Sequence, residues 1–218
     1  MNILALPVQL RAAAPIDSDT AAMAAALMQS RQTILPKRLA PPGPDAEQLD
    51  MILTAAASAP DHGQLLPWRL VQVPQAARGQ LAEVFGAALV ERDAAATADQ
   101  VEQACEKAYR APLLLLLVVD GVRGDPEIDL FERIVSAGCA VQNMLLMATA
   151  LGYGSALTSG RALKSAGLRS LFELADGDHA LCFVSIGTPQ SRKSARLRPP
   201  PADFVHTLSP AGQVVAGL

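Results

Sequence analysis

Two uninterrupted aliphatic runs constrain the fold of this chain most. The first is LLLLLVV at 113–119 and the second is ALCFVSIG at 180–187. Neither run alternates between apolar and polar residues, and each has the length of a strand rather than of a helix. Strands that are covered on both faces lose that alternation. We therefore expect both runs to form buried strands of a sheet.

Segments with helical spacing separate these strands. The pattern of apolar residues predicts helices over 45–59, 75–93, 98–110, 126–151 and 162–173, and a strand over 68–73. Asp45 and Gln48 have the spacing of a capping box, and Ser18 or Asp19 is expected to cap a helix through the alanines that follow. A chain of 218 residues with this alternation fits one large mixed domain of helices and strands.

Composition excludes several classes of protein. A formal net charge of -3 gives no reason to expect nucleic acid or an acidic membrane as a partner. No apolar run approaches the ~20 residues that span a bilayer, and the first residues lack the basic region of a signal peptide. The three widely spaced cysteines, Cys105, Cys139 and Cys182, favour thiols in a reducing compartment. These features predict a cytoplasmic protein.

The familiar catalytic motifs are missing from the sequence. His62, His179 and His206 are isolated, so no metal site is expected. The sequence contains no GxSxG elbow, no Walker A loop and no GxGxxG. We therefore predict no single catalytic side chain. If the protein is an enzyme, a cofactor supplies the chemistry.

One corner of the sequence combines an acid, an imidazole and the only tryptophan. In SAPDHGQLLPW, residues 58–68, a helical stretch stops at Pro60 and a strand-like run opens at Trp68. Trp68 is expected to anchor the core because its ring buries a large area. His62 either caps the preceding helix end or forms one wall of a ligand site.

The order of the weaker motifs supplies a resemblance. RQT at 31–33 precedes the corner, and SAGCAVQNM at 136–144, GYGSALTSG at 152–160, GTPQ at 187–190 and a basic tail follow it. This succession resembles the nitroreductase family of FMN-dependent oxidoreductases, and within it the compact branch that has APDH….PW after its first core helix. The resemblance covers about 30–205. It implies an N-terminal extension at 1–29 and a single FMN-binding domain at 30–218.

The resemblance implies an α+β sandwich whose central, mainly antiparallel sheet is flanked by helices. Two chains of the family intertwine, so that each FMN lies at the interface of a homodimer. GYGSALTSG is expected to be a glycine-rich loop beside the flavin.

Residues of this chain match the family's binding motifs one by one. Arg31 and Thr33 stand at the arginine and the serine of the family's RRS, which hold the FMN phosphate or ribityl chain, and Gln32 stands where a second arginine is usual. Ser58 and His62 match the corner that approaches the flavin. Thr158, Ser159 and Gly160 match an RSG near the flavin, with Thr158 in place of the arginine.

The basic tail offers a closing contact to the phosphate. Lys193, Arg196 and Arg198 are all candidates, and Arg198, directly before PPP, is the first choice. Guanidinium groups form short, charge-assisted hydrogen bonds to a phosphate. The sequence alone leaves the choice among the three cations open.

These matches imply an enzyme that passes hydride from NAD(P)H through FMN to a nitroaromatic, a quinone or a similar acceptor. Two alternatives stay open. One is a flavin-dependent dehydrogenase or flavin-consuming protein of the same fold. The other is a flavin-binding or interaction protein without turnover, which the replacements at Gln32 and Thr158 suggest.

Overall fold

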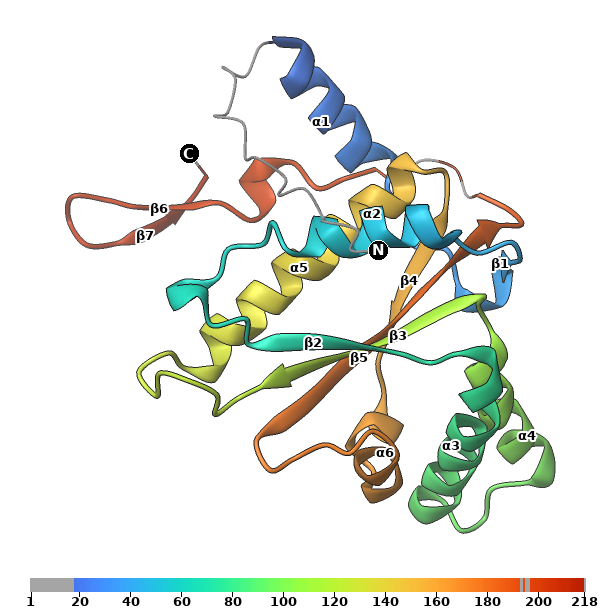
Figure 1. Cartoon of the computed structure of the whole chain (residues 1–218). Helices are drawn as coiled ribbons and strands as arrows, with labels where there is room; N and C mark the ends of the chain where they lie inside the picture. The colour runs from blue at the N-terminus through green and yellow to red at the C-terminus, as the bar shows by residue number, and fades with distance from the viewer. Residues whose placement is uncertain (1–17, 193, 195–196, 218) are drawn as a thin grey trace, which may run out of the picture.

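The computed structural model describes residues 18–192, 194 and 197–217 (Figure 1). Its α-helices are α1 (Ser18–Ser30), α2 (Ala46–Ala56), α3 (Arg78–Arg92), α4 (Ala98–Glu106), α5 (Leu130–Ala150) and α6 (Ala166–Leu171). Its strands are β1 (Leu39–Ala40), β2 (Trp68–Gln72), β3 (Leu113–Asp120), β4 (Gly154–Thr158), β5 (Asp178–Pro189), β6 (His206–Leu208) and β7 (Val214–Ala216). Short 3-10 turns include η1 (Pro36–Arg38), η2 (His62–Gln64), η4 (Lys107–Tyr109) and η5 (Arg161–Lys164).

The main sheet is antiparallel throughout its strand pairs. Its order is β1-β5-β3-β2, and β4 also pairs with β5. Helices α2 and α5 cover one face, whereas α3, α4 and α6 lie on the other (Figure 1). The predicted α+β sandwich with a mainly antiparallel sheet is confirmed.

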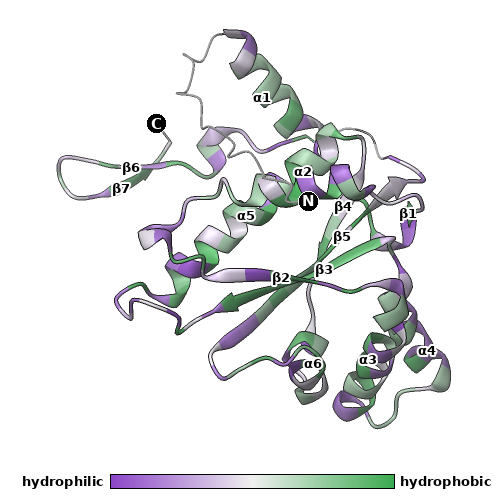
Figure 2. Cartoon of the chain, viewed as in Figure 1, coloured by the Kyte–Doolittle hydropathy of each residue, from purple (hydrophilic) through white to green (hydrophobic). Residues whose placement is uncertain are grey.

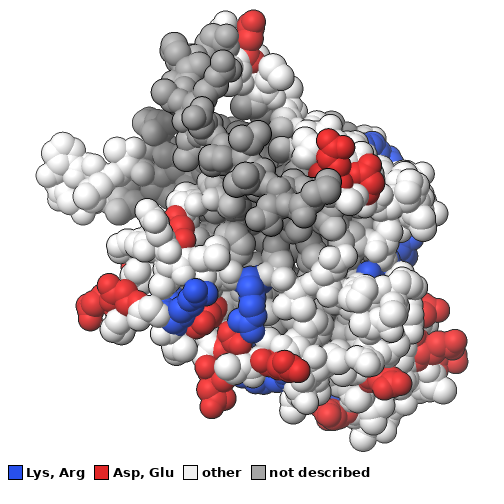
Figure 3. All heavy atoms as spheres, viewed as in Figure 1, with Lys and Arg blue, Asp and Glu red and all other residues white. Residues whose placement is uncertain are grey.

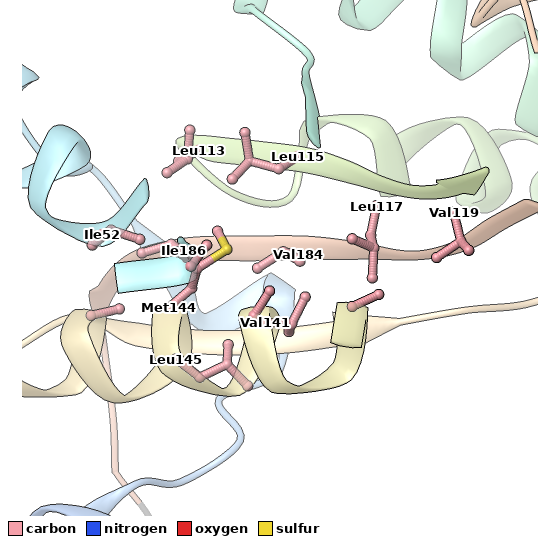
Figure 4. Packing of buried hydrophobic residues seen from close by; sticks show 14 residues of the cluster. Ile52, Leu113, Leu115, Leu117, Val119, Val141, Met144, Leu145, Val184 and Ile186 are labelled. Carbon is pink, nitrogen blue, oxygen red and sulfur yellow. The ribbon is translucent and has the colours of Figure 1, made fainter. Parts of the chain in front are cut away.

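The register of β3 explains its unbroken aliphatic sequence. Leu113, Leu115, Leu117 and Val119 belong to the core under α2 and α5, together with Ile52, Met144, Val184 and Ile186 (Figure 4). Leu114, Leu116 and Val118 belong to a second core against α3 and α6. Alternate side chains of a strand point to opposite faces, so a strand between two helical layers needs apolar residues at every position. Figure 2 shows this as green along the central strands.

Capping side chains determine where α2 and α5 begin. Asp45 and Gln48 form the predicted capping box of α2. The long helix α5 begins at Leu130 rather than at 126, because the Asp129 carboxylate accepts hydrogen bonds from the backbone N–H groups of Phe131 and Glu132. Such an N-cap satisfies donors that the first turn leaves free.

A buried arginine fixes the loop before α5. Arg133 is 1% exposed, and its guanidinium donates four hydrogen bonds to backbone carbonyls of the described residues. The acceptors are the carbonyls of Asp120, Arg123, Asp125 and Ile128, at 2.7–3.2 Å. The loop from β3 to α5 is therefore held in place by one side chain of the helix that it precedes.

The prediction that GYGSALTSG is a loop is wrong for its central part. Gly154–Thr158 forms β4, which pairs with β5 from Gly154 opposite Gly187 to Thr158 opposite Phe183. A Cβ at Gly154 would lie 2.9 Å from side-chain atoms of Ile34 and Leu39. The glycine therefore lets the segment after α1 lie directly against the strand. Only the two ends of the motif are turns.

Two elements project from the body on the side where α5 lies. Helix α1 has no buried residue among its thirteen. The β6–β7 hairpin extends away from the sheet and has no Lys, Arg, Asp or Glu, so Figure 3 shows it entirely white. Leu208 and Val214 are 68% and 71% exposed on it. Both arms thus present apolar side chains to solvent in the single chain. The extension at 1–29 stays a prediction, and residues 1–17 of it lie outside the described residues.

Candidate functional site

The RQT segment lies along β4. Thr33 forms an isolated parallel bridge with Ser155, and the backbone N–H of Ile34 donates to the Ser155 carbonyl at 2.9 Å. This places Arg31 and Thr33 beside the start of β4, with Thr33 exposed and Arg31 half-buried. Gln32 turns partly inward: its Oε1 is buried and, among the described residues, has no hydrogen-bond partner.

The tail returns to the same place. The Nη2 of Arg198 donates to the carbonyl oxygen of Arg31 at 2.9 Å. Neither guanidinium has a carboxylate within ion-pair distance among the described residues. Two like charges that no acid neutralises form a donor set suited to a phosphate. Lys193 and Arg196 lie outside the described residues, so the structure bears only on Arg198.

Arg192, a neighbouring arginine of the tail, was not predicted as a site residue from the sequence. The Nη2 of Arg192 donates to the carbonyl of Gly152 at 3.0 Å, in the turn before β4. The turn has the left-handed φ of +87° at Gly152, which a glycine adopts freely. In the sequence, no local pattern distinguishes Arg192 from the other cations of the tail.

A cavity of about 400 Å³ opens beside this cluster. Leu35 and Pro36, which continue the RQT segment, line it, and so do Thr158, Ser159 and Gly160 at the end of β4. Its remaining walls come from α3, α4, η4, η5 and the sheet. Their apolar members are Phe85, Ala88, Leu89, Ala104, Leu114, Ala162, Leu163 and Phe183. The RQT segment therefore continues into the cavity wall at Leu35 and Pro36, whereas neither 31–33 nor Arg198 lines the cavity itself.

Ser58 and His62 lie elsewhere. His62 is on η2, and its Nδ1 is 2.8 Å from Oε2 of Glu132, in the first turn of α5. The RQT segment instead meets β4, which follows the last turn of α5. Residues 132 and 150 of the helix are ~27 Å apart at ~1.5 Å per residue. One chain alone does not unite the two groups of predicted flavin contacts.

The rest of the corner has structural roles. The Nε1 of Trp68 donates to Ser136 Oγ at 3.1 Å, and its ring packs on the core as predicted. Asp61 Oδ2 accepts from the backbone N–H of Leu66 at 2.7 Å, which braces the corner. His62 does not cap α2. Its partner Glu132 is 70 residues away in sequence, and no spacing pattern could have indicated it.

The described residues show no group of three or more acidic, cysteine or histidine side chains that could hold a metal ion. No helix in the described part of the chain combines the length and the apolar character of a membrane span. The three cysteines are half-buried free thiols, and burial raises the pKa of Cys182 to about 11. A thiol with a raised pKa stays protonated and unreactive at neutral pH.

Comparison with known proteins places the chain in a family. The model of the nitroreductase family matches residues 28–188. "Putative NAD(P)H nitroreductase YdjA" of Escherichia coli K12 is 34% identical over 171 residues, which are 77% of this chain and 91% of the relative. A "Putative NAD(P)H nitroreductase" of Haemophilus influenzae is 32% identical over 162 residues, 74% of this chain and 87% of the relative.

Solved structures show the same fold at lower sequence identity. A nitroreductase-like family protein from Bacillus cereus has a TM-score of 0.72 and 17% identity, over 83% of this chain and 93% of that one. NADPH:FMN oxidoreductase from Vibrio harveyi, solved in complex with NAD+, has a TM-score of 0.65 and 19% identity, over 85% of this chain and 76% of that one. The match over most of the chain, together with relatives above 30% identity, shows that this protein belongs to the nitroreductase family.

Proposed function

We propose that this protein is an FMN-dependent NAD(P)H oxidoreductase that works as a homodimer and reduces nitroaromatics, quinones or similar acceptors. The observation that supports this most is that Arg31 and Arg198 have no acidic partner among the described residues and that the segment after Arg31 continues into the cavity wall at Leu35 and Pro36. The names of the relatives, NAD(P)H nitroreductases, point to the same activity.

The residues present fit FMN. A phosphate would be held by the guanidinium groups of Arg31 and Arg198 and by the hydroxyl of Thr33. These groups come from segments that are far apart in sequence but are already hydrogen-bonded to each other or to β4, so binding would order little additional backbone. Gln32 contributes through its backbone, because its side-chain oxygen is buried.

The cavity suits a flat, largely apolar ring. Its walls are mostly aliphatic and aromatic, and the backbone and hydroxyls of Thr158 and Ser159 supply hydrogen-bonding groups at one end. A Cβ at Gly160 would meet nothing within 4 Å, so the chain is open to a ligand at that residue. Bound FMN would supply the two-electron transfer between NAD(P)H and the acceptor. The protein's own contribution is to position both partners and to exclude water.

The placement of His62 and Ser58 supports a shared site. In a two-fold dimer that packs α5 against its copy in antiparallel fashion, the first turn of one helix lies beside the last turn of the other. His62 of one chain would then approach Arg31 and Thr33 of its partner. That arrangement would bring both predicted groups of contacts to one site.

The outer face of α5 has the character of such an interface. Phe131 and Val135 are 77% and 64% exposed, and Gly138 follows on the same face near the middle of the helix. Among the described residues, a Cβ at Gly138 would have no neighbour within 4 Å, so this part of the chain leaves the helix surface open there. Two exposed large apolar side chains followed by a glycine on one helix face favour close packing against another helix. The apolar β6–β7 hairpin extends on the same side and would pack against the second copy of the chain.

The three free thiols also bear on location. A chain with unpaired, half-buried cysteines is suited to a reducing compartment. We propose the cytoplasm, where NAD(P)H is available as the co-substrate.

His62 should contribute to the flavin site and little to the fold. Its side chain is 67% exposed, so His62→Ala removes one hydrogen bond to Glu132 and almost no core volume. We expect FMN affinity to fall roughly 2- to 10-fold, as for a hydrogen bond worth ~0.5–1.5 kcal/mol, with an unchanged melting temperature for the apo protein. His179→Ala, another exposed histidine, is the control. A large drop in apo stability with normal FMN binding would make His62 a structural residue.

The proposed function is tested by flavin loading and reduction. The purified protein, reconstituted with FMN, is expected to show a flavin absorbance spectrum that NADH or NADPH bleaches without oxygen and that a nitroarene or quinone restores. A protein that binds FMN but is not reduced by either nucleotide would be a binding protein without turnover. A protein that does not bind FMN at all would refute the proposal. Consumption of the flavin itself would indicate the remaining alternative.

A further inference from the structure

The corner at 61–66, between α2 and β2, has a strained backbone. Gln64 and Leu66 have left-handed φ values of +53° and +46°, although neither is a glycine. Asp61 Oδ2 braces the segment by accepting a hydrogen bond from the backbone N–H of Leu66 at 2.7 Å. Residues other than glycine keep this conformation only where surrounding contacts fix it, and such positions cluster at functional sites. The corner therefore keeps its shape against the preference of its backbone.

The corner also packs against the loop that precedes α5. A Cβ at Gly124 would collide with the side chain of Leu65, and a Cβ at Gly63 would lie 3.4 Å from the side chain of Ile128. That loop is itself fixed, because the buried guanidinium of Arg133 donates hydrogen bonds to its carbonyls. The corner is thus held against the start of α5.

The imidazole of His62 is held as well. A carboxylate only accepts hydrogen bonds, so the 2.8 Å contact between Nδ1 and Oε2 of Glu132 places a proton on Nδ1. Among the described residues Nε2 has no hydrogen-bond partner. When a carboxylate binds one ring nitrogen of a histidine, it sets the tautomer and the direction in which the other nitrogen points. Nε2 of His62 is therefore an available polar atom of defined orientation.

A stabilising ion pair on the surface does not explain this arrangement. Exposed ion pairs contribute little to stability. An acid in the first turn of α5 would favour the helix whether or not a histidine lies beside it. Neither role requires a braced corner with two strained residues.

From these contacts we infer that Glu132 is a positioning residue of the flavin site. It holds the imidazole of His62 so that Nε2 forms a hydrogen bond with the flavin of the shared site. Fixing the ring before the flavin arrives lowers the entropy that binding would otherwise cost. The inference rests on the proposed function and adds a residue to its site.

FMN titration of the apo dimer tests the role of Glu132. Glu132→Ala is expected to weaken FMN binding roughly 2- to 10-fold, as His62→Ala does, because the imidazole is no longer oriented. Glu132→Gln should keep most of the affinity, since its amide oxygen still accepts a hydrogen bond from Nδ1. Glu127→Ala, which removes an exposed acid of the preceding loop, is the control and should not weaken binding.

The sign of the change is informative, because FMN is an anion. Loss of a nearby carboxylate by itself would tighten FMN binding. Tighter binding in Glu132→Ala would therefore show that the carboxylate acts only through its charge, and it would overturn the inference.

A double-mutant cycle distinguishes positioning from an independent effect. In a His62→Ala background, Glu132→Ala should cause no further loss of FMN affinity, because no imidazole remains to be oriented. Additive losses would mean that Glu132 acts without His62, and they would also overturn the inference.

Two-bond 1H–15N correlations of the histidine rings give a readout that does not need the flavin. In alkaline buffer, where imidazole groups are neutral, His62 of the wild type should carry its proton on Nδ1, and Glu132→Ala should lose this preference. A proton on Nε2 in the wild type would overturn the inference. Wild-type protein that binds no FMN would refute the proposed function, on which the inference rests. Equal FMN affinity of the wild type and Glu132→Ala, in a protein that does bind FMN, would overturn the inference alone.

Discussion

Arg31→Ala is expected to weaken FMN binding by roughly 10- to 150-fold. The guanidinium of Arg31 has no acidic partner among the described residues, and the Arg198 side chain donates a hydrogen bond to the backbone carbonyl of Arg31. A charge-assisted contact to the phosphate would contribute ~1.5–3 kcal/mol, and each decade of affinity corresponds to ~1.4 kcal/mol. Fluorescence titration of the apo protein with FMN measures the effect directly.

Three comparisons make the role of Arg31 specific. Riboflavin lacks the phosphate, so its affinity should change little in Arg31→Ala. Arg31→Lys should recover only part of the FMN affinity, because an ammonium keeps the charge but loses the planar fork. Arg38→Ala, in η1 of the same segment, controls for general loss of positive charge. Equal weakening for FMN and riboflavin would show that Arg31 does not bind the phosphate.

Gly138→Leu is expected to convert the dimer to monomer and to remove FMN at the same time. A Cβ at this position meets no neighbour among the described residues, and leucine favours a helix over glycine by ~1 kcal/mol. The monomer should therefore stay folded. At a helix contact near a two-fold axis, however, the extra volume overpacks the interface at a cost of ~1–3 kcal/mol for each copy.

Light scattering coupled to size-exclusion chromatography measures the mass, and absorbance measures the retained flavin. Gly79→Leu is the matched control, because Gly79 is an exposed helical glycine on α3, on the other side of the sheet. We expect that variant to remain a flavin-loaded dimer. If Gly138→Leu behaves as Gly79→Leu does, the α5 face is not the interface.

The buried central strands were predictable from the sequence, because burial on both faces requires the nearly unbroken apolar runs that form β3 and β5. Likewise, the Asp45 capping box depends on two residues of fixed spacing, and it was found where the sequence placed it. β4 was mistaken for a loop because glycines at both ends of GYGSALTSG are typical of turns. Its strand conformation depends on pairing with β5 and on the close approach of Ile34 to Gly154, which has no side chain to block it. Both are long-range contacts.

The site was predictable only in part for the same reason. The resemblance selected Arg31, Thr33, Thr158–Gly160 and Arg198. The structure joins Arg198 to the backbone of Arg31 and Thr33 to β4, and Thr158–Gly160 line the cavity; their role in flavin binding stays a prediction. It could not show that His62 pairs with Glu132 at the other end of α5, since that separation depends on the length and placement of the helix. Arg92 and Lys107, which also line the cavity, were missed as well, because each is an isolated charge on its own helix or turn and only the fold unites them.

Mixed dimers test the central claim, a flavin site shared between two chains, most directly. Arg31→Ala and His62→Ala chains with different tags are coexpressed, and the mixed dimer is isolated through both tags. In a shared site, one of the two sites then contains both substitutions and the other contains neither. We predict that the mixed dimer binds FMN at one site with wild-type affinity, although neither homodimer has such a site. If each site belonged to one chain, both sites of the mixed dimer would carry a substitution. Absence of any wild-type-affinity site in the mixed dimer would therefore contradict the account.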